Sequence, residues 1–531
     1  TNRSPSFKPA QLASAIALAL SCAMLAPAQA QLNIPSTPIQ TNSGVAANLM
    51  FILDDSGSMH WEGMPDSMVY SNYAFPPPSH VYGGPNYGDG SELITSFDDS
   101  NSSAIKYRSA WLNKVYYDPT ITYTPWVKHD CTSFGNADPT RARFNPYDVI
   151  SMPGSTCNAV RDPNNRCMDL TIKQKYNRWS YPSSSSNKDF WPITFYQYKG
   201  SGNVNNASSF VRYQIRGNKA YRKDLATGNE SQVSSLSWPS GITRTVLEER
   251  QNFANWFSYY RSRILSVRGG TGLAFQGLDA NSFRVGFTTI NNGGINYQIP
   301  ITPDPVAGNF SGTYKQNFYE RLYQWPMPLS GTPLRRALRV VGDYYKNSTS
   351  GGPWAPDIGG GGLQVSCRQS FAILTTDGYW NGPNQNVGNQ DGTAGNVITG
   401  PDGASFKYTP VNPYQDSRSD TLADVAMKYW KEDLRTEAFM TNDVPTNSAD
   451  PAFWQHMSTF GVSLGANGTL DPATDLPNLM SGAKTWPDPF SNQNAKIDDL
   501  WHATLNGRGD FVAAQDPNEY AEALKKTLGE I

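Results

Sequence analysis

The chain has 531 residues, of which 38% are hydrophobic, and its formal net charge at pH 7 is −2. This length allows one large hydrophobic core or two moderate ones. A mean hydropathy of −0.52 argues against a membrane-embedded protein. No cluster of Lys and Arg with interleaved aromatic residues favours a nucleic-acid partner.

Residues 1–30 have the pattern of a secretory signal peptide. Two basic residues precede the apolar run 12–26, and Ala28-Gln29-Ala30 matches a small-x-small cleavage site. The run is short for a membrane-spanning anchor, and a lipid anchor is the less favoured alternative. We therefore predict an exported, not membrane-spanning protein whose mature chain begins with a flexible leader over residues 31–46.

Four cysteines follow the leader, namely Cys131, Cys157, Cys167 and Cys367. An even number in an exported chain favours disulfides, and four cysteines allow three pairings. We expect Cys157 to pair with Cys167 and Cys131 to pair with Cys367. Zinc is less favoured because no C-x-x-C spacing and no nearby histidine completes a tetrahedral set.

The most informative segment is the apolar run 49–53 followed by Asp54-Asp55-Ser56-Gly57-Ser58. The run predicts a strand over about 47–54, whose C-terminal tip carries Asp54, Ser56 and Ser58. Carboxylate and hydroxyl oxygens are hard ligands, which suit Mg²⁺ or Mn²⁺ better than Zn²⁺. Taken alone, the D-x-S-x-S pattern also fits a turn whose side chains bond their own backbone.

Two later segments add oxygen ligands. Residues 328–334 open an amphipathic helix, which places the Thr332 hydroxyl near the helix N-terminus with Pro333 in the first turn. Residues 370–378 read as a buried strand that ends in a second carboxylate, Asp377. In open α/β sheets, ligands bind at the carboxyl ends of strands, so the two carboxylates are expected at one edge.

Together the three segments, D-x-S-x-S, S-G-T-P and T-D-G, resemble the metal-ion-dependent adhesion site of von Willebrand factor A domains. In that family these residues coordinate Mg²⁺ directly or through water, and a carboxylate of the bound partner often completes the shell. The resemblance implies a site for Mg²⁺ or Mn²⁺ with the ligands Asp54, Ser56, Ser58, Thr332 and Asp377. Asp55 is expected to support the site rather than to bind the metal.

Residues 60–241 are rich in Tyr, Trp, Pro, Asn and Ser and show no helical period, which predicts an inserted, disulfide-containing module. Aromatic segments at 116–119, 123–126, 191–198 and 210–215 read as short strands or turns. Their aromatic residues either form an exposed binding face or hold an irregular module together. We favour the second interpretation, because aromatic side chains bury much area per residue.

Helical and strand patterns alternate after the insertion, which predicts an α/β fold with a doubly wound, mostly parallel sheet. The resemblance makes this a von Willebrand factor A-like domain over residues 47–531, interrupted at 60–241 and by a Gly/Asn-rich loop at 378–420. Helices are expected over 244–267, 317–323, from 333, 421–434, 500–505 and 518–528, and strands over 283–290, 297–301, 370–377, 457–464 and 510–514.

The signal peptide, the early metal loop, the large insertion and the tail motifs at 498–503 and 506–509 together resemble the N-terminal half of the PilY/PilC family of type IV pilus biogenesis factors and tip adhesins. The resemblance implies an exported protein at the pilus tip or cell surface, passing through periplasm and outer membrane. Its partners would be minor pilins and an acidic ligand on host cells or abiotic surfaces, with a response to mechanical load. Family members normally continue into a C-terminal β-propeller, so the chain either is a fragment or lacks that half.

An enzyme is the main alternative class. The chain has five histidines and no H-E-x-x-H, G-x-x-x-x-G-K-[ST] or G-x-S-x-G motif. We expect no Lys or Arg to accompany the metal loop and stabilise a transferring phosphoryl group. We therefore expect no catalysis. A second alternative is a structural pilus-assembly scaffold with a vestigial metal site.

Overall fold

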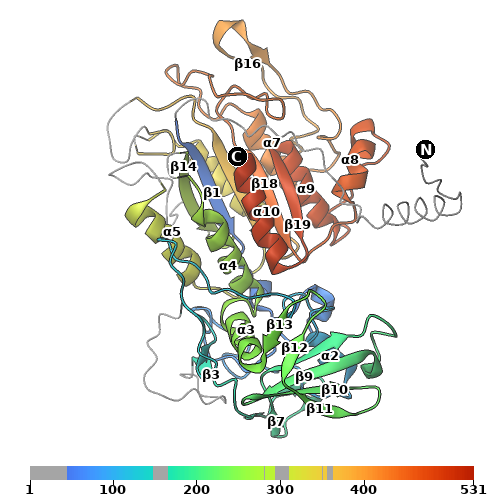
Figure 1. The fold of residues 1–531 in the computed structure, drawn as a ribbon. Coiled ribbons are helices and arrows are strands. Elements are labelled where there is room, and N and C mark those ends of the chain that lie inside the picture. The colour runs from blue at the N-terminus through green and yellow to red at the C-terminus, as the bar shows by residue number, and fades with distance from the viewer. Residues whose placement is uncertain (1–44, 148–165, 280–281, 293–309, 350, 356–362) are drawn as a thin grey trace, which may run out of the picture. The chain divides into compact units, whose positions relative to one another are not determined.

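Five parallel strands form the central sheet. The computed structural model describes residues 45–147, 166–279, 282–292, 310–349, 351–355 and 363–531, and Figure 1 shows their fold. The spatial order of the strands is β14-β1-β15-β18-β19, and the neighbouring pairs are parallel. In chain order this reads 2-1-3-4-5, so the direction of strand addition reverses between β1 and β15. The strands are β1 (Ala47–Leu53), β14 (Phe283–Thr289), β15 (Ser370–Thr376), β18 (Ser458–Leu464) and β19 (Arg508–Ala514).

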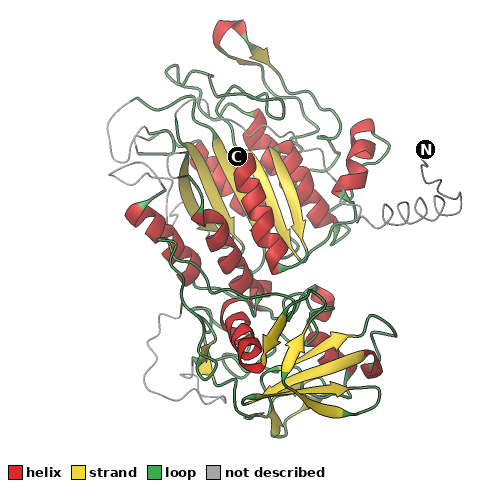
Figure 2. Ribbon diagram, in the orientation of Figure 1, coloured by secondary structure: helices red, strands yellow, loops and turns green. Residues whose placement is uncertain are grey.

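Helices lie in the connections between successive strands and form two layers, one on each face of the sheet, as Figure 2 shows. Among the described residues, none of these helices combines the length and apolar character needed to cross a membrane. The helices of this part of the chain are α3 (Val246–Tyr259), α4 (Arg263–Gln276), α5 (Gly312–Gln324), α6 (Leu334–Tyr345), α7 (Leu422–Lys431), α8 (Pro472–Ser481), α9 (Ala495–Asn506) and α10 (Pro517–Glu530).

The two layers exist because successive residues of β1 enter different cores. Leu49 and Phe51 pack in the core that contains residues of α4, α5 and α10. Met50 and Ile52 pack in the core that contains residues of α6, α7 and α9. A strand whose residues are apolar on both faces needs a helical layer on each face. The predicted α/β fold with a doubly wound parallel sheet is therefore confirmed.

The helices differ from the prediction in several places, and α5 and α9 are longer than the helices expected over 317–323 and 500–505. The expected single helix over 244–267 is wrong, because α3 ends at Tyr259 and the Ser262 side chain caps α4 by accepting a hydrogen bond from Leu265 N. The helix α8 was not predicted, although Asp471 caps it and Pro472 begins it. The expected strand over 297–301 lies outside the described residues.

The inserted region is mostly short strands and loops. Its largest element is an antiparallel sheet of order β11-β10-β9-β8, which contains two of the four aromatic segments, while those at 116–119 and 123–126 form no strand. The strands of the region are β2 (Ala142–Arg143), β3 (Cys167–Met168), β4 (Gln174–Tyr176), β5 (Trp179–Ser180), β6 (Ser183–Ser184), β7 (Lys188–Phe190), β8 (Thr194–Tyr198), β9 (Phe210–Arg216), β10 (Lys219–Asp224), β11 (Glu230–Val233), β12 (Ser235–Ser237) and β13 (Thr243–Thr245). The helix α2 (Ser102–Tyr107), the 3₁₀ turns Gly57–His60, Asp66–Met68, Ala207–Ser209 and Pro401–Gly403, and the pair β16 (Ile398–Thr399) and β17 (Ser405–Phe406) complete the described elements.

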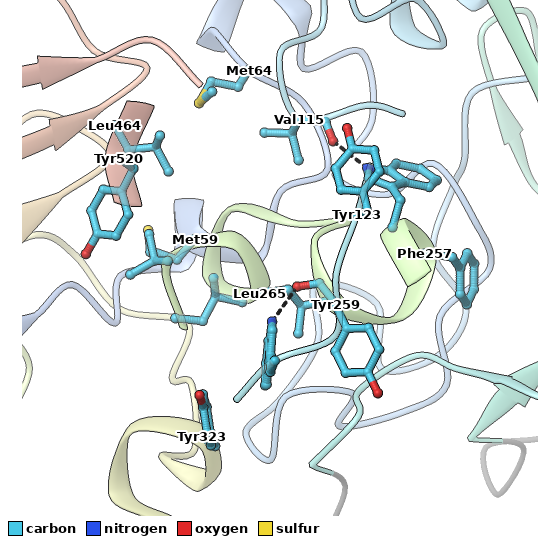
Figure 3. Close-up of a cluster of buried hydrophobic side chains, with 14 of the residues drawn as sticks. Met59, Met64, Val115, Tyr123, Phe257, Tyr259, Leu265, Tyr323, Leu464 and Tyr520 are labelled. Atoms are coloured by element: carbon cyan, nitrogen blue, oxygen red, sulfur yellow. Dashed lines mark hydrogen bonds between the residues drawn. The ribbon is translucent and has the colours of Figure 1, made fainter. Parts of the chain in front are cut away.

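Most aromatic residues of the inserted region are buried, as predicted. Trp126 and Trp179 are each 1% exposed. The indole nitrogen of Trp126 donates a hydrogen bond to Tyr259 O at 2.8 Å. Figure 3 shows part of the buried cluster, in which Tyr123, Phe257 and Tyr259 are labelled. Such side chains supply a large apolar area and satisfy their polar end locally. They therefore hold the inserted region together rather than form one exposed face.

The inserted region, extended by β13 and α3 to residue 260, begins and ends at a short stem formed by residues 61–63 and 261–263. Arg263 N donates to Trp61 O at 3.1 Å, and Arg261 Nε donates to the Glu62 carboxylate at 2.6 Å. Arg261 and Glu62 are 0% and 1% exposed, so this ion pair is buried. The stem fixes where the chain leaves the sheet domain and where it returns.

The predicted pairing of Cys131 with Cys367 is wrong, since both are free thiols. Cys131 lies in an exposed turn, where its N–H donates to Lys128 O at 3.0 Å. Cys367 precedes β15, at the end of the sheet opposite to the metal loop. Cys167 takes part in a disulfide, and its predicted partner Cys157 lies outside the described residues.

Candidate functional site

The two predicted metal-site carboxylates lie at the point where the strand order reverses. Asp54 follows β1 and Asp377 follows β15. These strands are parallel neighbours, with Ile52 opposite Leu374, so their C-terminal ends share one edge. Ligand crevices of open α/β sheets form at such a switch point, because the connections on its two sides diverge.

A chain of hydrogen bonds connects four of the predicted ligands. Asp54 Oδ1 accepts from Ser56 N at 2.7 Å, and the Ser56 and Ser58 hydroxyl oxygens are 3.1 Å apart. Ser58 Oγ donates to Asp377 Oδ1 at 2.9 Å. Thr376 Oγ1 holds the second oxygen of Asp54 at 2.7 Å. The structure thus brings the side chains of Asp54, Ser56, Ser58 and Asp377 together.

The fifth predicted ligand, Thr332, lies in a loop that is attached to both neighbours. Gly57 N donates to Ser330 O at 2.9 Å. Thr332 N donates to Asn381 Oδ1 at 2.9 Å, and Asn381 N donates to Thr332 O at the same distance. Within the described residues the Thr332 hydroxyl makes no hydrogen bond, so it is available for a ligand. Pro333 is the N-cap of α6 and not a residue of its first turn.

Asp55 is committed to structural hydrogen bonds. Its Oδ1 accepts from the backbone and side-chain nitrogens of Asn291, each at 3.0 Å, and its Oδ2 accepts from Trp325 Nε1 at 3.0 Å. Asp55 is 1% exposed. It therefore anchors the metal loop to the segment after β14 and faces away from the set formed by Asp54 and Asp377.

Burial makes it energetically unfavourable for the Asp54 and Asp377 carboxyl groups to be charged at the same time. Desolvation, and then the negative charge of Asp377, raise the pKa of Asp54 to about 7. Desolvation also raises the pKa of Asp377, although Arg263 opposes this shift. Two buried carboxylates that repel each other are what a bound divalent cation would compensate.

Arg263 is a site residue that the sequence did not reveal. Its Nη1 donates to Asp377 Oδ2 at 2.9 Å, and its Nη2 donates to Asp66 Oδ1 at 2.8 Å and to Gly63 O at 2.7 Å. The expectation that no Lys or Arg accompanies the metal loop is therefore wrong. Arg263 is the first residue of α4, far from the loop in sequence. The only local signal was a serine that can cap a helix, Ser262.

The donor set suits a hard cation held mainly by oxygen atoms. It comprises two carboxylates and three hydroxyl groups, and such ligands are typical of Mg²⁺ and Mn²⁺. In the part of the chain that the structure describes, no group of three or more His, Cys, Asp or Glu side chains could hold a metal. Any cation here would thus depend on the serine and threonine hydroxyls and on water.

The sequence is similar to three curated proteins, each named type IV pilus biogenesis factor PilY1, from Pseudomonas aeruginosa strains PAO1, PAK and UCBPP-PA14. Identity is 29% in each case, over 97%, 97% and 94% of this chain. The chain spans only about two-fifths of these relatives, namely 41%, 41% and 39% of their lengths. No protein-family model matches the chain, and no solved structure matches it.

Proposed function

Because the chain belongs to the PilY/PilC family of type IV pilus biogenesis factors, we propose that it serves pilus biogenesis and acts as a metal-dependent adhesin at the pilus tip. Similarity over nearly the whole chain supports the pilus role. The site at the switch point supports the adhesive role. The proposed location is the pilus tip or cell surface after export, in contact with minor pilins.

One observation carries the adhesive part of the proposal. Asp54, Ser56, Ser58 and Asp377, from two strand ends far apart in the chain, form one hydrogen-bonded set. A merely local turn would explain the contact of Ser56 with Asp54, but it would not recruit Asp377. A von Willebrand factor A-like fold accounts for both the parallel sheet and this set.

Mg²⁺ or Mn²⁺ would be held by Asp54, Ser56, Ser58, Thr332 and Asp377, directly or through water. A bound cation with an open coordination position supplies Lewis-acid attraction for a carboxylate on a surface or host-cell ligand. The side chains of this chain orient the oxygen donors. Asp55 anchors the loop, and Arg263 holds one oxygen of Asp377 so that the other faces Ser58.

A second candidate function is a structural assembly scaffold with a vestigial metal site. Arg263 favours it, because its guanidinium is a permanent cation that already compensates Asp377. In that case the ion pair would replace the metal as the element that stabilises the site. Pilus assembly would then need the fold but not divalent cations.

Calorimetry of Mg²⁺ and Mn²⁺ binding to the folded chain separates these functions. Binding by the wild type, with loss in Asp54→Ala and in Asp377→Ala, would support the adhesin. Asp402→Ala changes an exposed aspartate and should bind like the wild type. No binding by the folded wild type would move the assignment to the scaffold. In cells, Asp54→Ala should abolish adhesion and leave piliation intact, whereas loss of pili would support the scaffold.

A further inference from the structure

A pocket of about 310 Å³ lies in the inserted region and has walls from residues 70–72, 87–93 and 178–180. Backbone hydrogen bonds hold two of these walls together. Ile94 N donates to Arg178 O at 3.1 Å, and Ser180 N donates to Ile94 O at 3.0 Å. Ile94 also forms a bridge with Tyr73, next to the third wall. The pocket is thus built on fixed backbone and has the volume of a small-molecule site.

Three polar side chains that line the pocket have buried atoms without a partner. Glu92 is 5% exposed, and its Oε1 accepts from Gly88 N and Gly90 N at 3.2 Å each. Its Oε2 has no hydrogen-bond partner among the described residues, nor do Arg178 Nε and Ser180 Oγ. Leaving a buried polar atom unpaired costs about 1–3 kcal/mol. A water or a ligand that pairs with these atoms would remove this cost.

The rest of the lining combines apolar side chains with the polar residues Ser71, Asn72 and Ser91. The rings of Tyr70 and Tyr87 and the side chain of Leu93 line the pocket. Tyr87 is 42% exposed and Leu93 is 47% exposed, in a region whose other aromatic residues are mostly buried. Exposed apolar side chains around a hollow with convergent polar groups are typical of binding sites.

We propose that this pocket binds a pyranose ring of a saccharide. A sugar hydroxyl both donates and accepts, so neighbouring hydroxyls can donate to Glu92 Oε2 and accept from Arg178 Nε, with Ser180 Oγ in either role. The C–H face of the ring would lie against a tyrosine ring. A purely apolar ligand would leave all three polar atoms unpaired, and a simple anion would meet the carboxylate of Glu92.

The pocket adjoins the metal loop through one side chain. A Cβ atom placed on Gly57 would lie 2.5 Å from the Tyr87 hydroxyl, so Tyr87 touches the loop that carries Ser56 and Ser58. A glycan bound in the pocket could therefore extend to the metal loop. The saccharide site itself rests on the pocket alone and goes beyond the proposed metal-dependent adhesion.

Saturation-transfer NMR of the full chain with the methyl pyranosides of glucose, galactose, mannose and N-acetylglucosamine tests the proposal. At least one sugar should bind. Glu92→Gln and Tyr87→Ala should each weaken its affinity about tenfold or more. Trp111→Ala removes a side chain that is 58% exposed and outside the pocket, so it should bind like the wild type. Tyr87→Ala removes a partly exposed ring and should fold. It therefore tests the pocket even if Glu92→Gln fails to fold.

The same titration with EDTA, and with Asp54→Ala, separates this site from the metal site. Sugar binding should persist in both, whether or not the metal proposal holds. Binding that disappears with EDTA would place the sugar on the metal and overturn the pocket as a site of its own. Absence of saturation transfer to all four sugars by the folded chain would also overturn it.

Discussion

Arg263 Nη1 donates a 2.9 Å hydrogen bond to Asp377 Oδ2, and the two side chains are 1% and 0% exposed. This buried ion pair joins the start of α4 to the end of β15. It connects the segment in which the chain returns from the inserted region to the candidate metal site. The charge state of the site therefore depends on a residue that the metal motif does not contain.

Arg263→Ala should lower the free energy of unfolding by about 3–5 kcal/mol, because it leaves a buried carboxylate without its partner. Urea unfolding measures this change. Saturating Mg²⁺ should restore more stability to the variant than to the wild type, since the cation would compensate Asp377. Arg418→Ala is the control, because its ion pair with Asp488 is partly exposed and worth at most about 1 kcal/mol. Equal losses in both variants would contradict the importance of the buried pair.

Thr332→Ala should weaken Mn²⁺ binding about tenfold, which corresponds to about 1.4 kcal/mol. The Thr332 hydroxyl is free of hydrogen bonds to the described residues, and the side-chain oxygen and backbone nitrogen of Asn381 hold the backbone N–H and carbonyl of Thr332. Thr332→Ser keeps the hydroxyl and should bind like the wild type in calorimetry. If Thr332→Ala also binds like the wild type, this residue is not a ligand.

Asp55→Ala should reduce stability but retain metal binding, in contrast to Asp54→Ala. Its carboxylate accepts hydrogen bonds from Asn291 and Trp325, and their loss should cost about 1–3 kcal/mol. Thermal unfolding and Mn²⁺ calorimetry of the two variants give the comparison. Asp55 would have to be reassigned as a ligand if the folded variant lost Mn²⁺ binding.

Acid should destabilise the fold through His502. This side chain is stacked on Trp486 at 4.1 Å between ring centroids, and burial lowers its pKa from 6.5 to about 3. The unfolded chain then binds more protons between these pH values. His502 should remove up to about 1.4 kcal/mol per pH unit as the pH falls from about 6.5 to about 3. His502→Gln should show a shallower loss in urea unfolding between pH 7 and 4, and an unchanged slope would exclude His502 as the source.

Cys131 should react rapidly with iodoacetamide in the native chain, since it is an exposed free thiol. Cys367 is partly buried, and desolvation raises the pKa of its thiol, so it should react more slowly. Peptide mass spectrometry of the non-reduced protein measures both. A disulfide-linked peptide containing Cys131 and Cys367 would contradict the free thiols.

Local sequence patterns were sufficient to predict the five strands of the central sheet. The apolar runs before Asp54 and Asp377 each predict a buried strand, and parallel pairing then brings the strand ends together. Arg263 could not be found this way, because its partner Asp377 is 114 residues away and no periodicity links them. The break between α3 and α4 was also not predicted, although Ser262 caps α4. Arg261 lies in this break and donates to Glu62, a contact across 199 residues that local patterns do not reveal.

The stem at residues 61–63 and 261–263 has a consequence for how such a chain can evolve. Since the entry and exit of the inserted region are hydrogen-bonded to each other, the chain between them closes a loop whose entropic cost grows only slowly with length. Sequence between the two ends can therefore be lengthened, shortened or exchanged as a cassette while the path of the parallel sheet stays the same. Recombination at this stem would vary the inserted region and leave the core of the parallel sheet unchanged.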